Sequence, residues 1–113
     1  MKFIKNTDSV KYNNSDKCIA YEYPLGDNNL NVALVEVNGR YPEAGKVLNE
    51  KCKEIAFIIE GRGKVVVNDR EVLLEKGDSV LIEPKEEIYW EGDLKMLLSC
   101  SPAWTPEQYR IIQ

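Results

Sequence analysis

The stretch Glu54-Ile55-Ala56-Phe57-Ile58-Ile59-Glu60 carries apolar side chains on both faces of an extended chain. Successive side chains of a β-strand point to opposite faces, so Ile55 and Phe57 share one face and Ile58 lies on the other. A strand that is apolar on both sides is covered on both sides. We therefore expect one face to line the interior of a barrel and the other to pack against a second sheet or a second subunit.

Similar short segments extend over most of the chain and are separated by residues that favour turns. The pattern predicts strands at 18–23, 31–37, 54–60, 64–67, 71–74, 79–82, 88–91 and 94–100. The breaks between them supply Gly, Asn or Asp, as in Asn38-Gly39, Gly61-Arg62-Gly63, Asn68-Asp69, Lys76-Gly77-Asp78 and Glu91-Gly92-Asp93. The pair Asn68-Asp69 predicts a tight hairpin. Many short strands at near-regular spacing indicate an all-β sandwich or barrel.

The only helical signal lies in the tail, where Thr105 precedes Pro106 as an N-cap residue precedes proline at the first helical position. This signal predicts a helix of about two turns, which is stable only if it packs against the rest of the domain.

Composition excludes several classes of function. The chain has 113 residues with 15 basic and 19 acidic side chains, so its net charge is −4. This balance argues against a general binder of nucleic acids or anionic membranes, which would need a basic face. It contains no histidine. Imidazole general-base catalysis and histidine-containing metal sites are therefore excluded.

The cysteines and the N-terminal sequence predict a reduced, cytoplasmic protein. Cys18, Cys52 and Cys100 are odd in number and widely spaced, which argues against a disulfide framework or a zinc site. The first residues contain no apolar signal region, and no apolar run approaches the ~20 residues of a membrane span. We expect one domain over residues 1–113 that has no membrane partner.

Two longer segments resemble a known family. Residues 39–63 combine Gly39, Glu54 and the later Gly61, and residues 77–89 begin with Gly77-Asp78 and continue into an apolar strand and Pro84. These segments resemble the two motifs of the cupin superfamily, whose members are small double-stranded β-helix barrels. The resemblance covers about residues 31–104. It implies an all-β cupin jelly-roll barrel with a short C-terminal helical turn.

The resemblance also implies a homodimer. In many cupins the N-terminal strand pairs with the neighbouring subunit, and the strand at 18–23, within the N-terminal region 1–30, is the counterpart here. Burial of the outward face that contains Ile55, Phe57 and Ile59 would favour a two-fold dimer.

The metal ligands of the family are mostly missing from this chain. Metal-binding cupins typically use three histidines and one glutamate, and Glu54 is the counterpart of the glutamate. The histidine positions correspond to Val47 and Asn49 or to Leu48 and Glu50 in the first motif, and to Ile88 or Tyr89 in the second. We favour Tyr89 because the polar tip of a tyrosine is easily satisfied at a pocket mouth. The resemblance thus implies a cupin without the usual metal centre and without a cofactor.

Glu54 is the first candidate for a functional residue. The alternation of the strand directs its carboxylate inward, where it must be paired or neutral. It is either a ligand-binding carboxylate or general base with a raised pKa, or one member of a structural ion pair. Cys52 lies two residues before Glu54 and therefore points to the same face. No histidine exists to activate its thiol, so we expect Cys52 to be inert.

The other candidates surround this strand. We expect a ligand site composed of Arg40, Tyr41, Asn49, Glu50, Glu54, Tyr89 and Trp90. Aromatic walls suit sugars and flat rings, and the guanidinium of Arg40 suits an anion. An alternative is an all-oxygen metal site at Glu50, Glu54 and Glu86, which would accept Mg²⁺ or Ca²⁺.

Three functional hypotheses stay open at this point. The first is a binding protein for a small polar ligand, either sugar-like or anionic, in the barrel. The second is a metal-independent isomerase, epimerase or lyase that uses Glu54 and Tyr89 as the catalytic pair. The third is a structural homodimer with the oxygen-ligand metal site.

Overall fold

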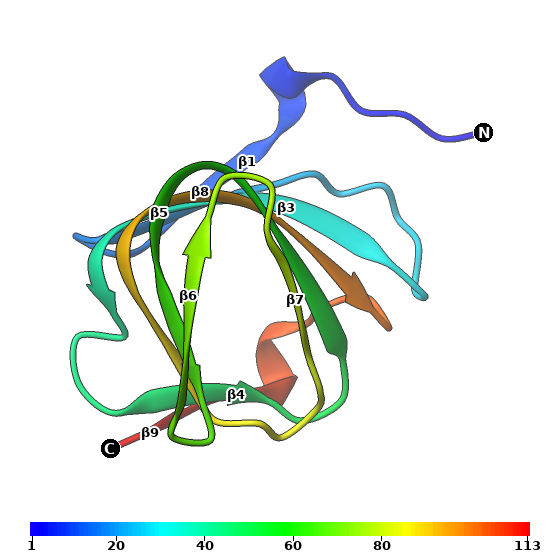
Figure 1. Cartoon of the computed structure of the whole chain (residues 1–113). Helices are drawn as coiled ribbons and strands as arrows, with labels where there is room; N and C mark the ends of the chain where they lie inside the picture. Colours follow the sequence, from blue (N-terminus) through cyan, green and yellow to red (C-terminus); the bar gives the residue numbers. More distant parts are fainter.

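The computed structural model describes all residues from 1 to 113 and is all-β (Figure 1). The strands are β1 (Val10–Ser15), β2 (Cys18–Glu22), β3 (Asn31–Tyr41), β4 (Lys46–Asn49), β5 (Lys53–Val67), β6 (Arg70–Glu75), β7 (Ser79–Ile82), β8 (Ile88–Ser101) and β9 (Tyr109–Ile112). Two single 3-10 turns, η1 (Asn6–Asp8) and η2 (Pro106–Gln108), complete the secondary structure. No helix reaches the length and apolar character that a membrane crossing requires. The fold is an all-β barrel, as the sequence predicts.

One continuous antiparallel sheet forms the barrel. Its main path runs β1-β2-β3-β8-β4-β9, and β5 adds pairings to β6, β7 and β8. The long strands β5 and β8 pair from Lys53 opposite Ser101 to Val67 opposite Ile88. Figure 1 shows the sheet curling back on itself, so that one face of each long strand points into the interior.

The alternation predicted for β5 is confirmed. Ala56 and Ile58 point inward and are fully buried, whereas Ile55 is 48% and Phe57 46% exposed on the outer face. The inward residues of β8 complete the core, and Met96 is fully buried opposite Ile58. Glu54 lies an even number of residues before Ile58, so its side chain also points to the inner face of β5.

Three of the predicted breaks are wrong. Asn38-Gly39, Gly61-Arg62-Gly63 and Glu91-Gly92-Asp93 lie inside β3, β5 and β8. In β5 and β8 these glycines serve a close approach between strands: Gly63 pairs with Gly92, and a Cβ on Gly92 would lie 2.5 Å from the Gly63 Cα. Gly63 and Gly92, which we expected to lie in turns, therefore allow β5 and β8 to pair closely without a break.

The hairpin at Asn68-Asp69 is confirmed. Both residues have positive φ angles, 47° and 69°, as the two central residues of a tight type I′ hairpin require. The chain reverses here from β5 into β6, with Val67 opposite Arg70.

The tail and the N-terminal region differ from expectation. The C-terminal helical turn is present, but it is the single 3-10 turn Pro106–Gln108, not two turns of helix, because the following residues pair with β4 as β9. Strands β1, β4 and β9 are not predicted by the sequence pattern. Within the chain, β2 pairs with β1 on one side and β3 on the other. Neither edge of the 18–23 strand is therefore free for the expected pairing with a neighbouring subunit, and β1 is the edge strand instead.

Substitution of Gly92 tests the close crossing of β5 and β8. We expect Gly92→Ala to lower the free energy of unfolding by about 3 kcal/mol, because the new methyl group meets Gly63 backbone and the residue has a positive φ. Gly77→Ala is the matched control. Gly77 also has a positive φ but no atom lies within 4 Å of its Cβ position, so we expect a loss of only about 1 kcal/mol. Equal losses in urea denaturation would contradict the steric explanation.

The expected homodimer stays a prediction, and the outer face of the sheet offers a direct test. Ile55 lies opposite Leu81, and Phe57 lies opposite Leu97, so four exposed apolar side chains adjoin one another. We expect a dimer in sedimentation velocity at micromolar concentration and a monomer for Phe57→Lys, because a buried lysine opposes association. Leu73→Lys, at an exposed leucine on β6, is the control that should leave the dimer intact. A wild-type monomer at all concentrations would refute the prediction.

Candidate functional site

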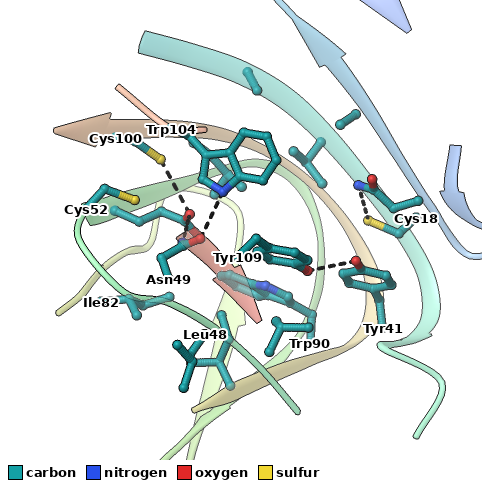
Figure 2. Close-up of a pocket in the computed structure, with 18 of the residues that line it drawn as sticks. Cys18, Tyr41, Leu48, Asn49, Cys52, Ile82, Trp90, Cys100, Trp104 and Tyr109 are labelled. Atoms are coloured by element: carbon teal, nitrogen blue, oxygen red, sulfur yellow. Dashed lines mark hydrogen bonds between the residues drawn. The ribbon is translucent and has the colours of Figure 1, made fainter. Parts of the chain in front are cut away.

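A cavity of about 500 Å³ lies inside the curled sheet (Figure 2). Of its 23 lining residues, 16 are hydrophobic, which is the composition typical of sites for small organic molecules. Inward side chains of β2, β3, β5 and β8 form the wall, and β4 and the C-terminal tail contribute Asn49, Trp104 and Tyr109. The few polar groups in this wall therefore decide what the cavity binds.

Glu54 is the most deeply buried of the cavity's acidic groups. It is 7% exposed and lies on β5 opposite Ile82 on one side and Cys100 on the other. Its Oε2 accepts a hydrogen bond from Asn49 Nδ2 at 3.2 Å and one from the Cys100 thiol at 3.5 Å. Asn49 is held in turn by Trp104, whose Nε1 donates to Asn49 Oδ1 at 2.8 Å (Figure 2). These contacts fix the orientation of the carboxylate.

The second oxygen of Glu54 is free to contact a ligand. Its Oε1 makes no hydrogen bond in the protein, whereas Oε2 makes two. No buried side-chain nitrogen or oxygen in the structure lacks a hydrogen-bond partner. Oε1 must therefore lie at the surface of the cavity, where a bound molecule can reach it.

Burial raises the pKa of Glu54 above its ordinary value. The hydrogen bonds from Cys100 and Asn49 counteract part of this effect, while the negative charge of Glu22 adds to it. Glu22 also lines the cavity, from the end of β2, and burial raises its pKa as well. The cavity thus contains two carboxyl groups that bind protons more tightly than exposed ones.

A pair of tyrosines forms a second polar feature of the cavity wall. The hydroxyls of Tyr41 and Tyr109 lie 2.7 Å apart in one hydrogen bond, and burial raises the pKa of both phenols. The ring of Tyr109 packs edge-to-face on Trp104, with centroids 5.7 Å apart. The pair therefore presents neutral hydroxyl groups and aromatic surface to the cavity.

All three cysteines are free and buried. Cys52 and Cys100 line the cavity beside Glu54. The pKa of Cys100 is raised by its hydrogen bond with Cys52 and by burial, with a further contribution from the neighbouring Glu54 carboxylate. The Cys100 thiol therefore stays protonated and is a poor nucleophile, whereas the same hydrogen bond lowers the pKa of Cys52.

Four of the predicted site residues come together in the cavity wall: Tyr41, Asn49, Glu54 and Trp90. Glu86 reaches the same wall, where its Oε1 accepts a hydrogen bond from the Glu83 backbone N–H at 2.7 Å. The sequence pattern therefore predicted five residues that lie together on the wall of one cavity.

Three predicted residues do not face the cavity, and their expected directions are wrong. On β8 the inward side chains are Ile88 and Trp90, so strand alternation turns Tyr89 to the outer surface. There the guanidinium of Arg40 lies 3.8 Å from the Tyr89 ring centroid and donates to the backbone oxygens of Pro42 and Gly45. Ile88, the other residue that could correspond to the family's second-motif histidine, is the one that faces the cavity.

Glu50 is the third residue that lies elsewhere. Its carboxylate forms a salt bridge with Arg110 of β9, with Nε and Oε1 3.2 Å apart. The expected oxygen-ligand metal site at Glu50, Glu54 and Glu86 is therefore not assembled, and no group of three or more acidic or thiol side chains is arranged to hold a metal ion. At the histidine positions of metal-binding cupins, Val47 and Ile88 place aliphatic groups on the cavity wall and Asn49 places an amide.

Sequence reasoning missed Glu22, Trp104 and Tyr109. Glu22 could have been found, because it continues the alternation of Cys18 and Ala20, whose small side chains face inward. Trp104 directly precedes the helix that the sequence pattern predicts after Thr105, and Tyr109 falls within that predicted helix. Their contribution depends on the pairing of β9 with β4.

Substitution of Glu54 should change how stability depends on pH. A carboxyl whose pKa is higher in the folded state than in the unfolded state binds more protons when folded, so stability falls as pH rises from the unfolded pKa through the folded one. We expect Glu54→Gln to gain stability over the wild type as pH increases from acidic to neutral, and to match it most closely at low pH. Urea denaturation across this range measures the difference. A constant difference at all pH values would contradict the raised pKa.

Comparison with known proteins agrees with this architecture. Among proteins with curated descriptions, none matches the chain. Among solved structures, the Streptomyces nucleoside dehydratase Pac13 has a TM-score of 0.90 at 19% identity and covers 100% of this chain and 92% of its own. KdgF from Halomonas has a TM-score of 0.74 at 15% identity, covering 95% and 98%. An RmlC-like cupin from Shewanella frigidimarina has a TM-score of 0.73 at 16% identity, covering 89% and 90%.

At these identities the likeness to solved structures shows the fold alone. The family is shown by sequence: the family model described as Cupin domain matches residues 34–97, which is more than half of the chain. This chain belongs to the cupin domain family.

Proposed function

We propose that the protein binds a small polar molecule of the sugar or nucleoside class in the cavity beside Glu54, without a conventional cupin metal centre. The observation that carries this proposal is the Oε1 atom of Glu54, a free hydrogen-bond acceptor in a mostly apolar cavity. Burying such a group without a partner is unfavourable, and a bound hydroxyl or N–H group would supply the partner.

The shape and lining of the cavity support this ligand class. A volume of about 500 Å³ falls in the range of small-molecule sites. Trp90, Trp104 and Tyr109 offer aromatic surface on which a sugar or base ring can pack. The similar structure Pac13 is a nucleoside dehydratase, and a variant of it is known with uridine, which makes nucleosides the first compounds to test.

The anionic ligand expected from Arg40 receives no support. No lysine or arginine lines the cavity, and Arg40 is occupied on the outer surface. We therefore restrict the proposal to ligands without negative charge.

Ligand-induced stabilisation tests the proposal. We expect uridine or a neutral monosaccharide to raise the melting temperature by several degrees, since a ligand at 100 times its Kd stabilises by about 2.7 kcal/mol. Glu54→Gln replaces one carboxylate oxygen with an NH2 donor. Because Asn49 and Cys100 donate to Oε2, we expect the NH2 group to take the place of Oε1 and to weaken binding about tenfold or more. Glu50→Gln is the matched control, because Glu50 lies outside the cavity in its bridge to Arg110. Absence of any shift with a broad set of neutral and cationic metabolites would overturn the proposal.

A metal-independent isomerase, epimerase or lyase is the second candidate function. Its supporting observation is that a buried carboxyl group with a raised pKa shares one cavity with the hydroxyl pair of Tyr41 and Tyr109, which is a possible base and acid. Tyr89 cannot take the acid role that we expected, because it lies on the outer face. Mass spectrometry of an identified ligand after incubation separates turnover from binding.

A further inference from the structure

The charged groups of the cavity wall are all acidic. Glu22, Glu54, Glu83 and Glu86 line the cavity, and none of the 15 lysines and arginines of the chain does. A cavity lined by charges of one sign concentrates ligands of the opposite sign. The wall therefore favours positive charge in the ligand.

The two carboxylates at the rim are partly satisfied by the protein. Lys53 Nζ lies 3.6 Å from Glu83 Oε1. Glu86 accepts hydrogen bonds from the Glu83 backbone N–H at 2.7 Å and from Asn68 Nδ2 at 3.4 Å. Each of these two groups thus already has a cation or a hydrogen-bond donor within the protein.

The inner two carboxylates, Glu22 and Glu54, have no cationic partner. Neither takes part in a salt bridge. Glu22 accepts no side-chain hydrogen bond, and Glu54 leaves Oε1 unpaired although the residue is more than nine-tenths buried. The negative charge of Glu22 also acts unfavourably on the ionised form of Glu54. Two like charges in one partly desolvated cavity are a destabilising arrangement that a cation would relieve.

The aromatic residues of the same wall suit a cation. Five aromatic side chains line the cavity: Tyr12, Tyr41, Trp90, Trp104 and Tyr109. Aromatic faces attract ammonium and guanidinium groups through their quadrupoles. A hydroxyl group of the ligand could only donate a hydrogen bond to Glu54 Oε1. A protonated nitrogen could donate the same hydrogen bond, compensate the negative charge of Glu22 and make cation–π contacts with the aromatic rings.

We infer that the ligand of this cavity carries a cationic nitrogen, as an amino sugar or an amino nucleoside does, with an N–H group that donates to Glu54 Oε1 and a charge balanced by Glu54 and Glu22. This inference rests on the proposed function, because it assigns the charge of the ligand that the cavity takes.

Matched sets of compounds that differ only in charge test the inference. One set is glucose, glucosamine and glucuronate. The other is uridine, its 5′-amino-5′-deoxy analogue and its 5′-carboxylate. Binding is measured by calorimetry at neutral pH. We expect the amine to bind about tenfold or more tightly than the alcohol, and the carboxylate to bind weakest, in whichever set binds.

Two variants assign the effect to the two carboxylates. Glu54→Gln and Glu22→Gln should each reduce the preference for the amine over the alcohol, whereas Glu50→Gln should retain it. Glu22 is only partly buried, so its variant keeps the test valid if Glu54→Gln folds poorly. The variants thus separate a charge interaction from a general loss of cavity shape, which would weaken all three compounds alike.

The outcomes distinguish this inference from the proposed function. If the alcohol or the carboxylate binds as tightly as the amine, the cationic assignment is overturned and the binding function stands. An amine preference that both carboxylate variants retain also overturns it. If no compound of either set binds and a wider set of metabolites gives no thermal shift, the proposed function itself is refuted and the inference with it.

Discussion

The buried carboxylate of Glu54 is the constraint around which the site is organised. An ionisable group on the inner face of a strand must find hydrogen-bond partners or stay protonated. The fold supplies partners to one oxygen only, from Asn49 and Cys100. Trp104 then holds Asn49 in place. The result is a rigid acceptor whose second oxygen faces an apolar cavity.

The position of that carboxylate depends on how β5 and β8 run together. Both strands stay continuous for 14 residues or more because Gly63 and Gly92 allow their backbones to approach closely. The same pairing sets Glu54 opposite Cys100 and Trp90 opposite Val65. Glycines that look like turn residues thus determine which side chains meet across the barrel.

The cavity is completed by chain segments that are distant in sequence. Tyr41 at the end of β3 bonds to Tyr109 of the tail, and Trp104 reaches the residue at the end of β4. The acidic character of the wall arises in the same way, because Glu22 of β2 and Glu54 of β5 approach only in the folded barrel. Electrostatic properties of the site therefore belong to the assembly of strands and not to any single motif.

The all-β class, the hairpin at Asn68-Asp69 and the inward direction of Glu54 could be predicted from the amino-acid pattern, because they follow from local turn chemistry and the two-residue period of a strand. The direction of Tyr89 was not determined, since a one-residue uncertainty in register reverses every side chain of a strand. Three features became visible only in the folded barrel: Arg40 packs outside on Tyr89, the tail forms β9 on β4, and the cavity contains carboxylates without cations. Each of these depends on contacts between residues far apart in the chain, which local pattern cannot specify.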